Sequence, residues 1–269
     1  KNDIKDFEII LIDSRKISAI VSVCKPIYLT KSGLKLVVIF CILILEHVLS
    51  INQPESNVFG RFFGIMRLMK IVILAGGPAT AFDTLIKAHT DNTNTFFIGV
   101  DRGAFRLMQA GFPVHLAIGD FDSLNPEEYA AVRAYADQIE QSPAEKDDTD
   151  LELAVLTAIE QFPDASEILI LGGLGGRFDH EIQIFYLVLQ ARFSGLLSKI
   201  TLLDTQNIIR FVGAGRHVLT KMPEMTYLAF ASLTPVLGFS IKEAKYELAK
   251  TDYPTNFSLS SNEFVGDKI

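Results

Sequence analysis

The sequence predicts an α/β domain with a mostly parallel sheet, followed by a small all-β sandwich domain. Three observations lead to this fold class. Short apolar runs alternate with stretches of helical periodicity between residues 69 and 207. Several of these runs end directly in Asp or Gly, as expected where parallel strands carry functional loops. Beyond residue 207 the helical periodicity fades, and short β-like runs are separated by Gly and Pro.

The bulk composition is that of a folded globular protein, and it excludes several kinds of functional site. Of the 269 residues, 49% are hydrophobic and 21% are charged, which argues against disorder and allows one large domain or two smaller ones. The two cysteines, Cys24 and Cys41, both lie near the N-terminus. This excludes a disulfide framework, and in the rest of the chain a cysteine-based zinc site or nucleophile.

Charge is unevenly distributed along the chain. Residues 1–68 hold nine Lys or Arg and six Asp or Glu, whereas residues 69–269 hold 16 and 26, a net charge of −10. Because contacts with nucleic-acid phosphates need Lys and Arg, this acidic body argues against a nucleic-acid partner. It can still bind a nucleotide whose phosphates are bridged by a divalent cation.

Residues 1–68 are interpreted as an extension that precedes the globular protein. Their apolar run at 36–45 is about half as long as the roughly 20 residues of a membrane-spanning helix, so we expect no membrane association. A membrane-proximal anchor, an extra buried strand or helix, and a segment upstream of the native start are three interpretations. The last is favoured, because Met66 and Met69 stand just before a strand-like run at 71–74.

Strand-like runs and helical patterns define the α/β part, residues 69–207. Strands are expected at 71–74, 95–100, 116–118, 167–171 and 200–203. Residues 150–161 and 179–193 place apolar side chains at helical spacing. Such alternation indicates a sheet covered on both faces, with ligands at the carboxyl ends of its strands. The β domain, residues 208–269, is expected to hold strands at 208–212, 217–219, 226–233 and 246–248.

Residues 119–123, Gly-Asp-Phe-Asp-Ser, place two carboxylates at a predicted strand end. In an extended loop, Asp120 and Asp122 would point the same way. Two carboxylates on one side suit Mg²⁺, which prefers one or two carboxylates together with phosphate oxygens and water. The alternative is a turn whose aspartates are solvated or cap the helix that begins near Pro126.

Residues 146–150, Lys-Asp-Asp-Thr-Asp, form a second acidic cluster. Thr149 or Asp148 would cap a helix here, with the carboxylates facing the positive end of the helix dipole. The acids exceed what capping needs, and Lys146 could hold a phosphate. The two interpretations are compatible, since a capping loop can also present Asp150 to a metal.

Residues 172–180, Gly-Gly-Leu-Gly-Gly-Arg-Phe-Asp-His, follow a predicted strand and precede a helix. Glycines let backbone N–H groups approach a phosphate, and Arg177 can grip phosphate oxygens in a bidentate way. The stretch is neither a Walker A loop nor a good dinucleotide fingerprint, and His180 alone is more typical of a structural residue. Asp101, at another strand end, either binds a metal or nucleotide or pairs with Arg102 in a turn. Phosphoryl-type transfer is the chemistry that these residues favour.

Taken in order, residues 100–104, 119–123, 146–150, 172–180 and 261–263 resemble the corresponding motifs of thiamine pyrophosphokinases. The resemblance covers roughly residues 69–269. It implies an α/β catalytic domain followed by a β-sandwich domain, and a cytoplasmic homodimer. The implied reaction transfers a diphosphate from ATP to the hydroxyethyl group of thiamine and releases AMP.

The resemblance also implies roles for single residues. Mg²⁺ would be held by Asp120, Asp122 and Asp150. ATP and its phosphates would be bound by Asp101, Lys146, Thr149 and Arg177. The residues at the transfer site would be Asp122, Asp150, Arg177 and Asp179, with Asp179 or Asp150 as candidate general base. Thiamine would be bound by Ser261 and Asn262 from the β domain.

Two features depart from the family pattern. Ile184 stands where the family often has Asn, and the chain stops at Ile269, where relatives usually continue for a strand or two. We therefore expect a shortened β domain. Two alternatives to the kinase are a non-catalytic nucleotide- or thiamine-binding module and a pyrophosphokinase with a different acceptor.

Overall fold

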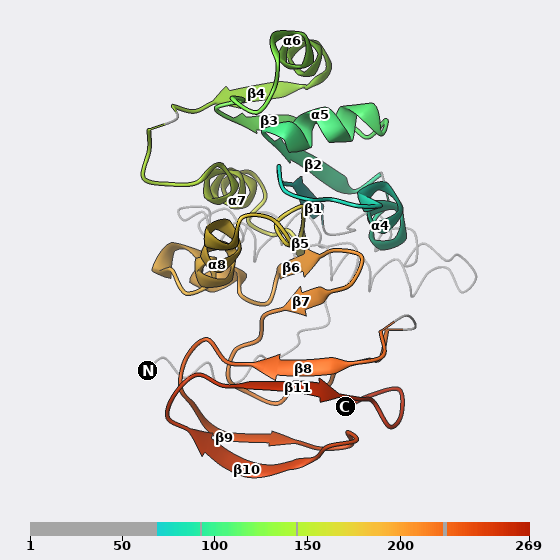
Figure 1. Cartoon of the computed structure of the whole chain (residues 1–269), viewed down its shortest axis with the longest axis vertical. Helices are drawn as coiled ribbons and strands as arrows, with labels where there is room; N and C mark the ends of the chain where they lie inside the picture. The colour runs from blue at the N-terminus through green and yellow to red at the C-terminus, as the bar shows by residue number, and fades with distance from the viewer. Residues whose placement is uncertain (1–68, 92, 144, 223–224) are drawn as a thin grey trace, which may run out of the picture. The chain divides into compact units, whose positions relative to one another are not determined.

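The structure, a computed structural model, describes residues 69–91, 93–143, 145–222 and 225–269 (Figure 1). The N-terminal extension and its apolar run lie outside the described residues, so their interpretation stays a prediction. Among the helices of the described ranges, none is both long and apolar enough to cross a membrane.

A seven-stranded sheet in the order β4-β3-β2-β1-β5-β6-β7 forms the first domain. All neighbouring strands are parallel except β6 and β7, which are antiparallel. The strands are β1 (Lys70–Leu74), β2 (Thr95–Val100), β3 (Leu116–Gly119), β4 (Gln138–Gln141), β5 (Glu167–Leu171), β6 (Ile200–Leu203) and β7 (Ile208–Arg210). The mostly parallel sheet that the sequence predicts is confirmed.

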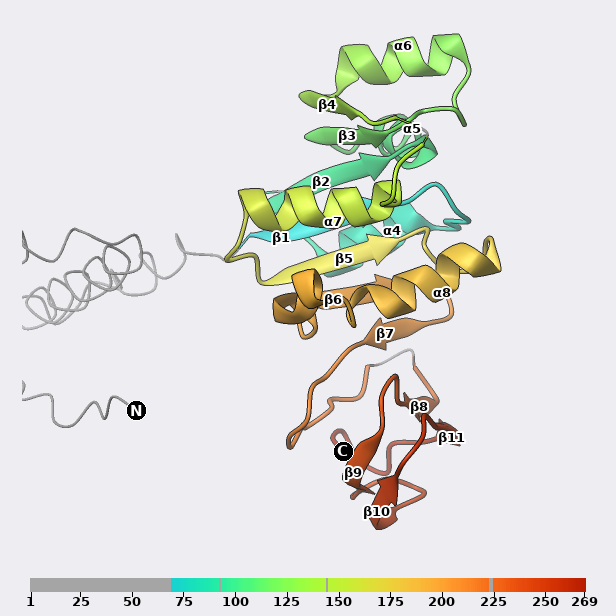
Figure 2. The same cartoon turned by 90° about the vertical axis from the view of Figure 1, so that its left-hand side faces the viewer.

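Helices cover both faces of this sheet, as Figures 1 and 2 show. They are α4 (Phe82–His89), α5 (Arg102–Gln109), α6 (Pro126–Tyr135), α7 (Asp150–Gln161), α8 (Phe178–Leu187) and the 3₁₀ helix η3 (Ala191–Leu196). Side chains of β1 alternate between the faces, because successive strand residues point to opposite sides. Ile71 and Ile73 pack in the cluster that contains α7 and α8, whereas Val72 and Leu74 pack in the cluster that contains α4 and α5.

Burial of these strand side chains is the main stabilising contribution to the sheet. Ile73 and Leu74 are both 0% exposed, and full burial of a side chain of this size contributes about 1.5–3 kcal/mol. The sheet therefore provides a rigid frame for the loops at its carboxyl edge.

The second domain is built from two antiparallel pairs of strands. β8 (Leu228–Ala231) pairs with β11 (Ser258–Asn262), and β9 (Val236–Ile241) pairs with β10 (Leu248–Tyr253). Phe230 of β8 and Phe239 of β9 join the two pairs, with ring centroids 5.7 Å apart. The expected small all-β domain is confirmed, and the structure shows that its strands form antiparallel pairs.

Four elements differ from their expected positions. The helix expected at 179–193 ends at Leu187 as α8 and is followed by the separate 3₁₀ helix η3, and of the run expected at 246–248 only Leu248 lies in a strand, at the start of β10. The run expected at 208–212 supplies β7, which pairs with β6 at the edge of the parallel sheet. Around the run expected at 217–219, Leu219 exchanges two backbone hydrogen bonds with Ile269, of 2.8 and 2.9 Å. The last residue of this sequence is thereby tied into the β domain.

Candidate functional site

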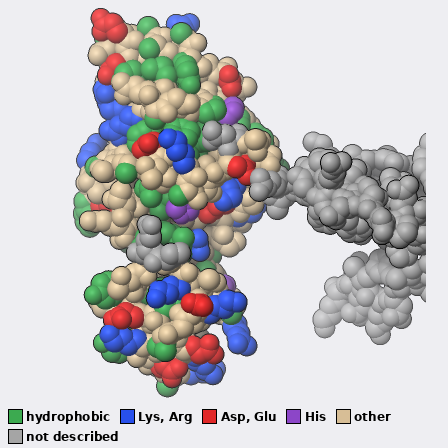
Figure 3. Space-filling model, turned by 90° about the vertical axis from the view of Figure 1, so that its right-hand side faces the viewer, with side chains coloured by type: hydrophobic (Ala, Val, Ile, Leu, Met, Phe, Trp, Pro, Cys, Tyr) green, Lys and Arg blue, Asp and Glu red, His purple; other side chains and the backbone are tan. Residues whose placement is uncertain are grey.

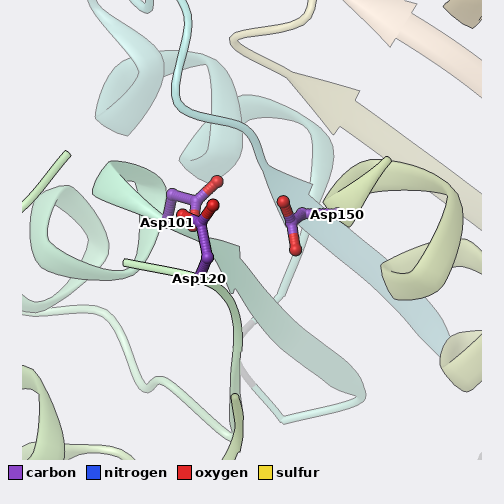
Figure 4. Close-up of side chains that lie close together, drawn as sticks. All are labelled: Asp101, Asp120 and Asp150. Atoms are coloured by element: carbon purple, nitrogen blue, oxygen red, sulfur yellow. The ribbon is translucent and has the colours of Figure 1, made fainter. Parts of the chain in front are cut away.

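Three aspartates from separate parts of the chain lie together at the carboxyl edge of the sheet. Asp101 follows β2, Asp120 follows β3, and Asp150 is the first residue of α7. One carboxylate oxygen of each lies within 4.8 Å of those of the other two. Figure 4 shows Asp150 facing the other two side chains. We call Asp101, Asp120 and Asp150 the carboxylate trio.

Asp101 is held by a backbone conformation that L-residues rarely adopt. Its φ is 48° and its ψ is −120°, and a strained non-glycine residue of this kind costs about 1–3 kcal/mol. Its Oδ1 accepts a hydrogen bond of 3.1 Å from the N–H of Phe121. A Cβ atom on Gly119 would stand 1.9 Å from the same oxygen. Gly119 therefore makes the room in which the Asp101 carboxylate sits.

Burial, together with the charges of Asp150, Asp120 and Asp122, raises the pKa of the Asp101 carboxyl to about 6, against the lowering effect of the Phe121 N–H. Negative charge thus accumulates at this edge of the sheet. A hard divalent cation prefers carboxylate oxygens and would neutralise that charge. The trio therefore fits a metal ion by both its donor atoms and its electrostatics.

Asp150 is positioned by two donors from the loop that precedes α7. Ser142 Oγ donates a hydrogen bond of 2.6 Å to Asp150 Oδ1, and Lys146 Nζ lies 2.8 Å from the same oxygen. The Lys146 ammonium also donates to the carbonyl of Pro143 at 2.9 Å. Lys146, which the sequence predicts to bind a phosphate, thus places its positive charge next to the carboxylate trio.

Asp122 lies outside the trio. The prediction for residues 119–123 assumed an extended loop, but Phe121 has a φ of 59°, so the chain turns between the two aspartates. The Asp122 N–H donates a 3.1 Å hydrogen bond to Asp120 Oδ1, and its own side chain is exposed. Its predicted role as a metal ligand stays a prediction.

The acidic residues of the second cluster, residues 146–150, contact different partners. Thr149 caps α7, as one of the two expected candidates, and forms a reciprocal capping box with Glu152. Asp148 is instead bound by both terminal nitrogens of Arg192, at 2.9 and 2.6 Å. Capping thus accounts for Thr149, whereas Asp150 faces Asp101 and Asp120.

The glycines after β1 and β5 let two loops touch backbone to backbone. A Cβ on Gly77 would stand 2.4 Å from the carbonyl oxygen of Gly172, and a Cβ on Gly172, whose φ is 69°, would stand 2.6 Å from the oxygen of Ala75. Next along the chain, Arg177 and Asp179 form an exposed ion pair of 2.7 Å. The Arg177 guanidinium also holds the pKa of Asp179 below its usual range.

In the β domain the two predicted thiamine ligands have different surroundings. Ser261 is exposed and has a φ of 61°. Asn262 is 4% exposed, and its side chain accepts from the Tyr246 N–H at 3.0 Å and donates to the Tyr246 carbonyl at 2.9 Å. Asn262 therefore anchors a backbone turn next to Ser261, and both thiamine assignments stay predictions.

Two residues next to the site were missed by sequence reasoning. Glu152 is buried, and the Thr-x-x-Glu spacing from Thr149 is a capping-box signal that could have found it. Arg192 contacts Glu152 across a separation of 40 residues, and local spacing contains no signal for such a contact.

Comparisons with known proteins agree with this geometry. The family model described as thiamin pyrophosphokinase, catalytic domain, matches residues 88–200, and the model of the thiamin pyrophosphokinase vitamin B1 binding domain matches residues 216–269. The chain is 35% identical over 189 residues to the thiamine pyrophosphokinase of Bacillus subtilis (strain 168), covering 69% of this chain and 81% of that protein.

Solved structures agree as well. A thiamin pyrophosphokinase family protein from Enterococcus faecalis matches with a TM-score of 0.67 and 39% identity, over 74% of this chain and 91% of that one. The thiamine pyrophosphokinase of Bacillus subtilis matches with a TM-score of 0.63 and 30% identity, again over 74% and 91%. The first family model spans the carboxylate trio, and the second spans Ser261 and Asn262.

Proposed function

This chain belongs to the thiamine pyrophosphokinase family, and on that premise we propose that it transfers a diphosphate group from ATP to the hydroxyl group of thiamine. The hydroxyl oxygen forms a bond to the β-phosphorus, the bond between the α–β bridging oxygen and the β-phosphorus breaks, AMP leaves, and the hydroxyl proton is released. The carboxylate trio inside the catalytic-domain match is the observation that carries the proposal.

We propose that the resident metal is Mg²⁺ and that Asp101, Asp120 and Asp150 hold it. When bound, Mg²⁺ supplies positive charge that neutralises the transferring phosphates. Asp122 stays in the proposed ligand set, because its N–H contacts Asp120 and its charge raises the pKa of Asp101. The trio fits the ion through its oxygen donors and its accumulated negative charge.

The residues around the trio have complementary proposed roles. Lys146 stands 2.8 Å from Asp150 and places an ammonium group where ATP phosphates would bind. Arg177 follows the glycine loop and precedes the first residue of α8, a position that suits a phosphate. Thr149 contributes by capping α7 and orienting Asp150.

The remaining proposed roles concern the proton and the acceptor. Asp179 and Asp150 are the candidate general bases. The Arg177 guanidinium lowers the pKa of Asp179, which keeps this carboxylate ionised and able to accept a proton but makes it a weaker base. Ser261 and Asn262 are proposed to bind thiamine, and their support is the vitamin B1 binding match over residues 216–269.

We further propose a homodimer. An exposed apolar stripe on α8 and just beyond its end supports this assembly, because monomeric proteins rarely expose such patches. The stripe, spaced by three or four residues, consists of Phe178, Ile182, Tyr186 and Leu189, which are 71%, 37%, 51% and 44% exposed. Sedimentation of the wild-type chain should give twice the chain mass, and Tyr186→Asp should shift it toward the monomer; a wild-type monomer would contradict the assembly.

The nature of the substrates agrees with the charge of the molecule. On the β domain, in the lower part of Figure 3, Lys and Arg side chains alternate with Asp and Glu on the face in view. Nucleic-acid binding needs a clustered basic surface, whereas the net charge of −10 over residues 69–269 supports small-molecule substrates. The cytoplasmic location expected from the family stays a prediction.

The experiment that tests the proposed function measures AMP release from ATP with Mg²⁺, in the presence and in the absence of thiamine. Thiamine-dependent AMP formation is the expected result. Thermal stabilisation by ATP or thiamine without AMP would instead favour a binding module. AMP formation with another hydroxyl acceptor that thiamine fails to inhibit would favour a pyrophosphokinase of different specificity.

A further inference from the structure

We propose that Glu152 is a positioning residue whose carboxylate ties the first turn of α7 to α8 and η3 and so fixes where Asp150 stands in the carboxylate trio. The effect that we predict on the kinetics rests on the proposed function. The main measurement is metal binding, which does not depend on that function.

The Glu152 carboxylate has more donors than helix capping needs. It is 3% exposed. Its Oε2 accepts from the N–H and the hydroxyl of Thr149, both at 3.0 Å, and from Gln183 Nε2 at 2.9 Å. Its Oε1 accepts from Gln190 Nε2 at 2.6 Å and from Arg192 Nη2 at 3.3 Å. A capping box explains the contacts with Thr149 alone.

The additional donors come from distant parts of the chain. Gln183 lies on α8, which starts after Arg177 and the glycine loop, and Gln190 immediately precedes η3. They stand 31 and 38 residues away from Glu152 along the sequence. One buried carboxylate therefore connects the loop of the second acidic cluster to the helix that follows the glycine loop.

The geometry of an α-helix makes this anchor act on Asp150. Residues two positions apart on a helix are rotated by about 200°, so Glu152 and Asp150 project from nearly opposite sides of α7. Glu152 is bound on the side of α8 and η3, while Asp150 faces Asp101 and Asp120. When the Glu152 side of the helical turn is held in place, the position of Asp150 relative to Asp101 and Asp120 is fixed as well.

Arg192 contacts both Glu152 and Asp148 and so determines which acidic residues of the second cluster are paired. Its two terminal nitrogens grip Asp148, one of them reaches Glu152, and its Nε donates to Gln190 Oε1 at 2.8 Å. The planar fork of Arg suits such bidentate binding. Asp148 is thereby paired with Arg192, and Asp150 is the member of the cluster that belongs to the trio.

The decisive experiment compares Glu152→Gln with Glu160→Gln in the full chain. Glu160 lies on the same helix and is exposed, which makes it the matched control. The amide of Glu152→Gln keeps the shape but turns one acceptor into a donor that faces other donors. Mn²⁺ binding, followed by electron paramagnetic resonance without nucleotide or thiamine, should weaken about tenfold, as for other residues that orient metal ligands.

Kinetics and stability separate positioning from simple capping. Glu152→Gln should raise the KM for Mg²⁺ more than it lowers kcat, and excess Mg²⁺ should restore most of kcat. Glu160→Gln should match the wild type in both. If Glu152→Gln only lowers Tm, while its Mn²⁺ affinity per folded molecule stays within about twofold of the wild type, the inference is overturned.

A second pair of variants covers the case in which Glu152→Gln does not fold. Gln183→Ala and Gln190→Ala each remove one donor and keep the carboxylate, and each should weaken Mn²⁺ binding several-fold; unchanged affinity in both overturns the inference. A wild type that binds Mn²⁺ but forms no thiamine-dependent AMP refutes the proposed function, and the Mn²⁺ comparison still decides the role of Glu152. A wild type that binds no Mn²⁺ overturns the inference.

Discussion

Replacement of Asp101 by Asn should stabilise the metal-free protein at neutral pH while it weakens metal binding. Burial raises the pKa of the Asp101 carboxyl from 3.8 to about 6. One pKa unit corresponds to about 1.36 kcal/mol, so ionisation of Asp101 in the folded state costs up to about 3 kcal/mol. Because Asp101 is partly solvated and its neighbours can relax, about 1–2 kcal/mol is the magnitude we expect to measure.

The sign of the pH dependence follows from linkage. Between about pH 4 and pH 6 the folded state binds more protons at Asp101 than the unfolded state does, so the stability contributed by this group falls as pH rises and stays low above pH 6. Asp101→Asn keeps an oxygen that can accept from the Phe121 N–H and removes the charge. The variant should therefore gain stability relative to the wild type as pH rises through this range.

The assay is thermal unfolding in EDTA at pH 4 and at pH 8, with Asp267→Asn, an exposed aspartate of the β domain, as control. Asp101→Asn should raise Tm at pH 8 by at least about 2 °C relative to the wild type, and by less at pH 4. Added Mn²⁺ should stabilise the wild type more than the variant. An Asp101→Asn Tm that is equal to or below the wild-type Tm at pH 8 would refute the electrostatic reasoning.

Three further substitutions test the site and its frame. Gly119→Ala places a Cβ 1.9 Å from Asp101 Oδ1 at a φ of 145°, so it should lower the free energy of unfolding by about 1–3 kcal/mol and weaken Mn²⁺ binding, measured by denaturation and titration. Gly77→Ala, with its Cβ 2.4 Å from a backbone oxygen, should lower Tm, whereas Gly195→Ala meets nothing within 4 Å and should not. Lys146→Met should raise the KM for ATP by about tenfold or more, since an ion pair with phosphate is worth at least about 1.4 kcal/mol; an unchanged KM would contradict its phosphate role.

Much of the fold could be predicted because it depends on local pattern. The runs that became β1, β2, β5 and β6 are apolar, and those of β2, β5 and β6 are followed directly by Asp or Gly, so their burial and their loop positions follow from the local sequence pattern. β4 was not predicted, since its sequence Gln-Ile-Glu-Gln carries one apolar residue and it lies at the edge of the sheet. An edge strand needs no continuous apolar run, because part of it faces water.

The site was predicted less completely, because its geometry depends on the backbone and on distant contacts. Asp101 belongs to the trio through a positive φ and through the space that Gly119 leaves, and neither is encoded in the spacing of aspartates. The turn at Phe121 separates Asp122 from Asp120, where an extended loop was assumed. Arg192 reaches the second acidic cluster across 44 residues, which no local motif can reveal.

The measurement that tests the central claim most directly is phosphorus NMR of ATP and thiamine incubated with the full chain and Mg²⁺. The account predicts AMP and thiamine diphosphate in equal amounts, with both lost in Asp120→Asn and Asp150→Asn variants that remain folded. Formation of ADP with thiamine monophosphate, or equal turnover by the wild type and these two variants, would contradict it.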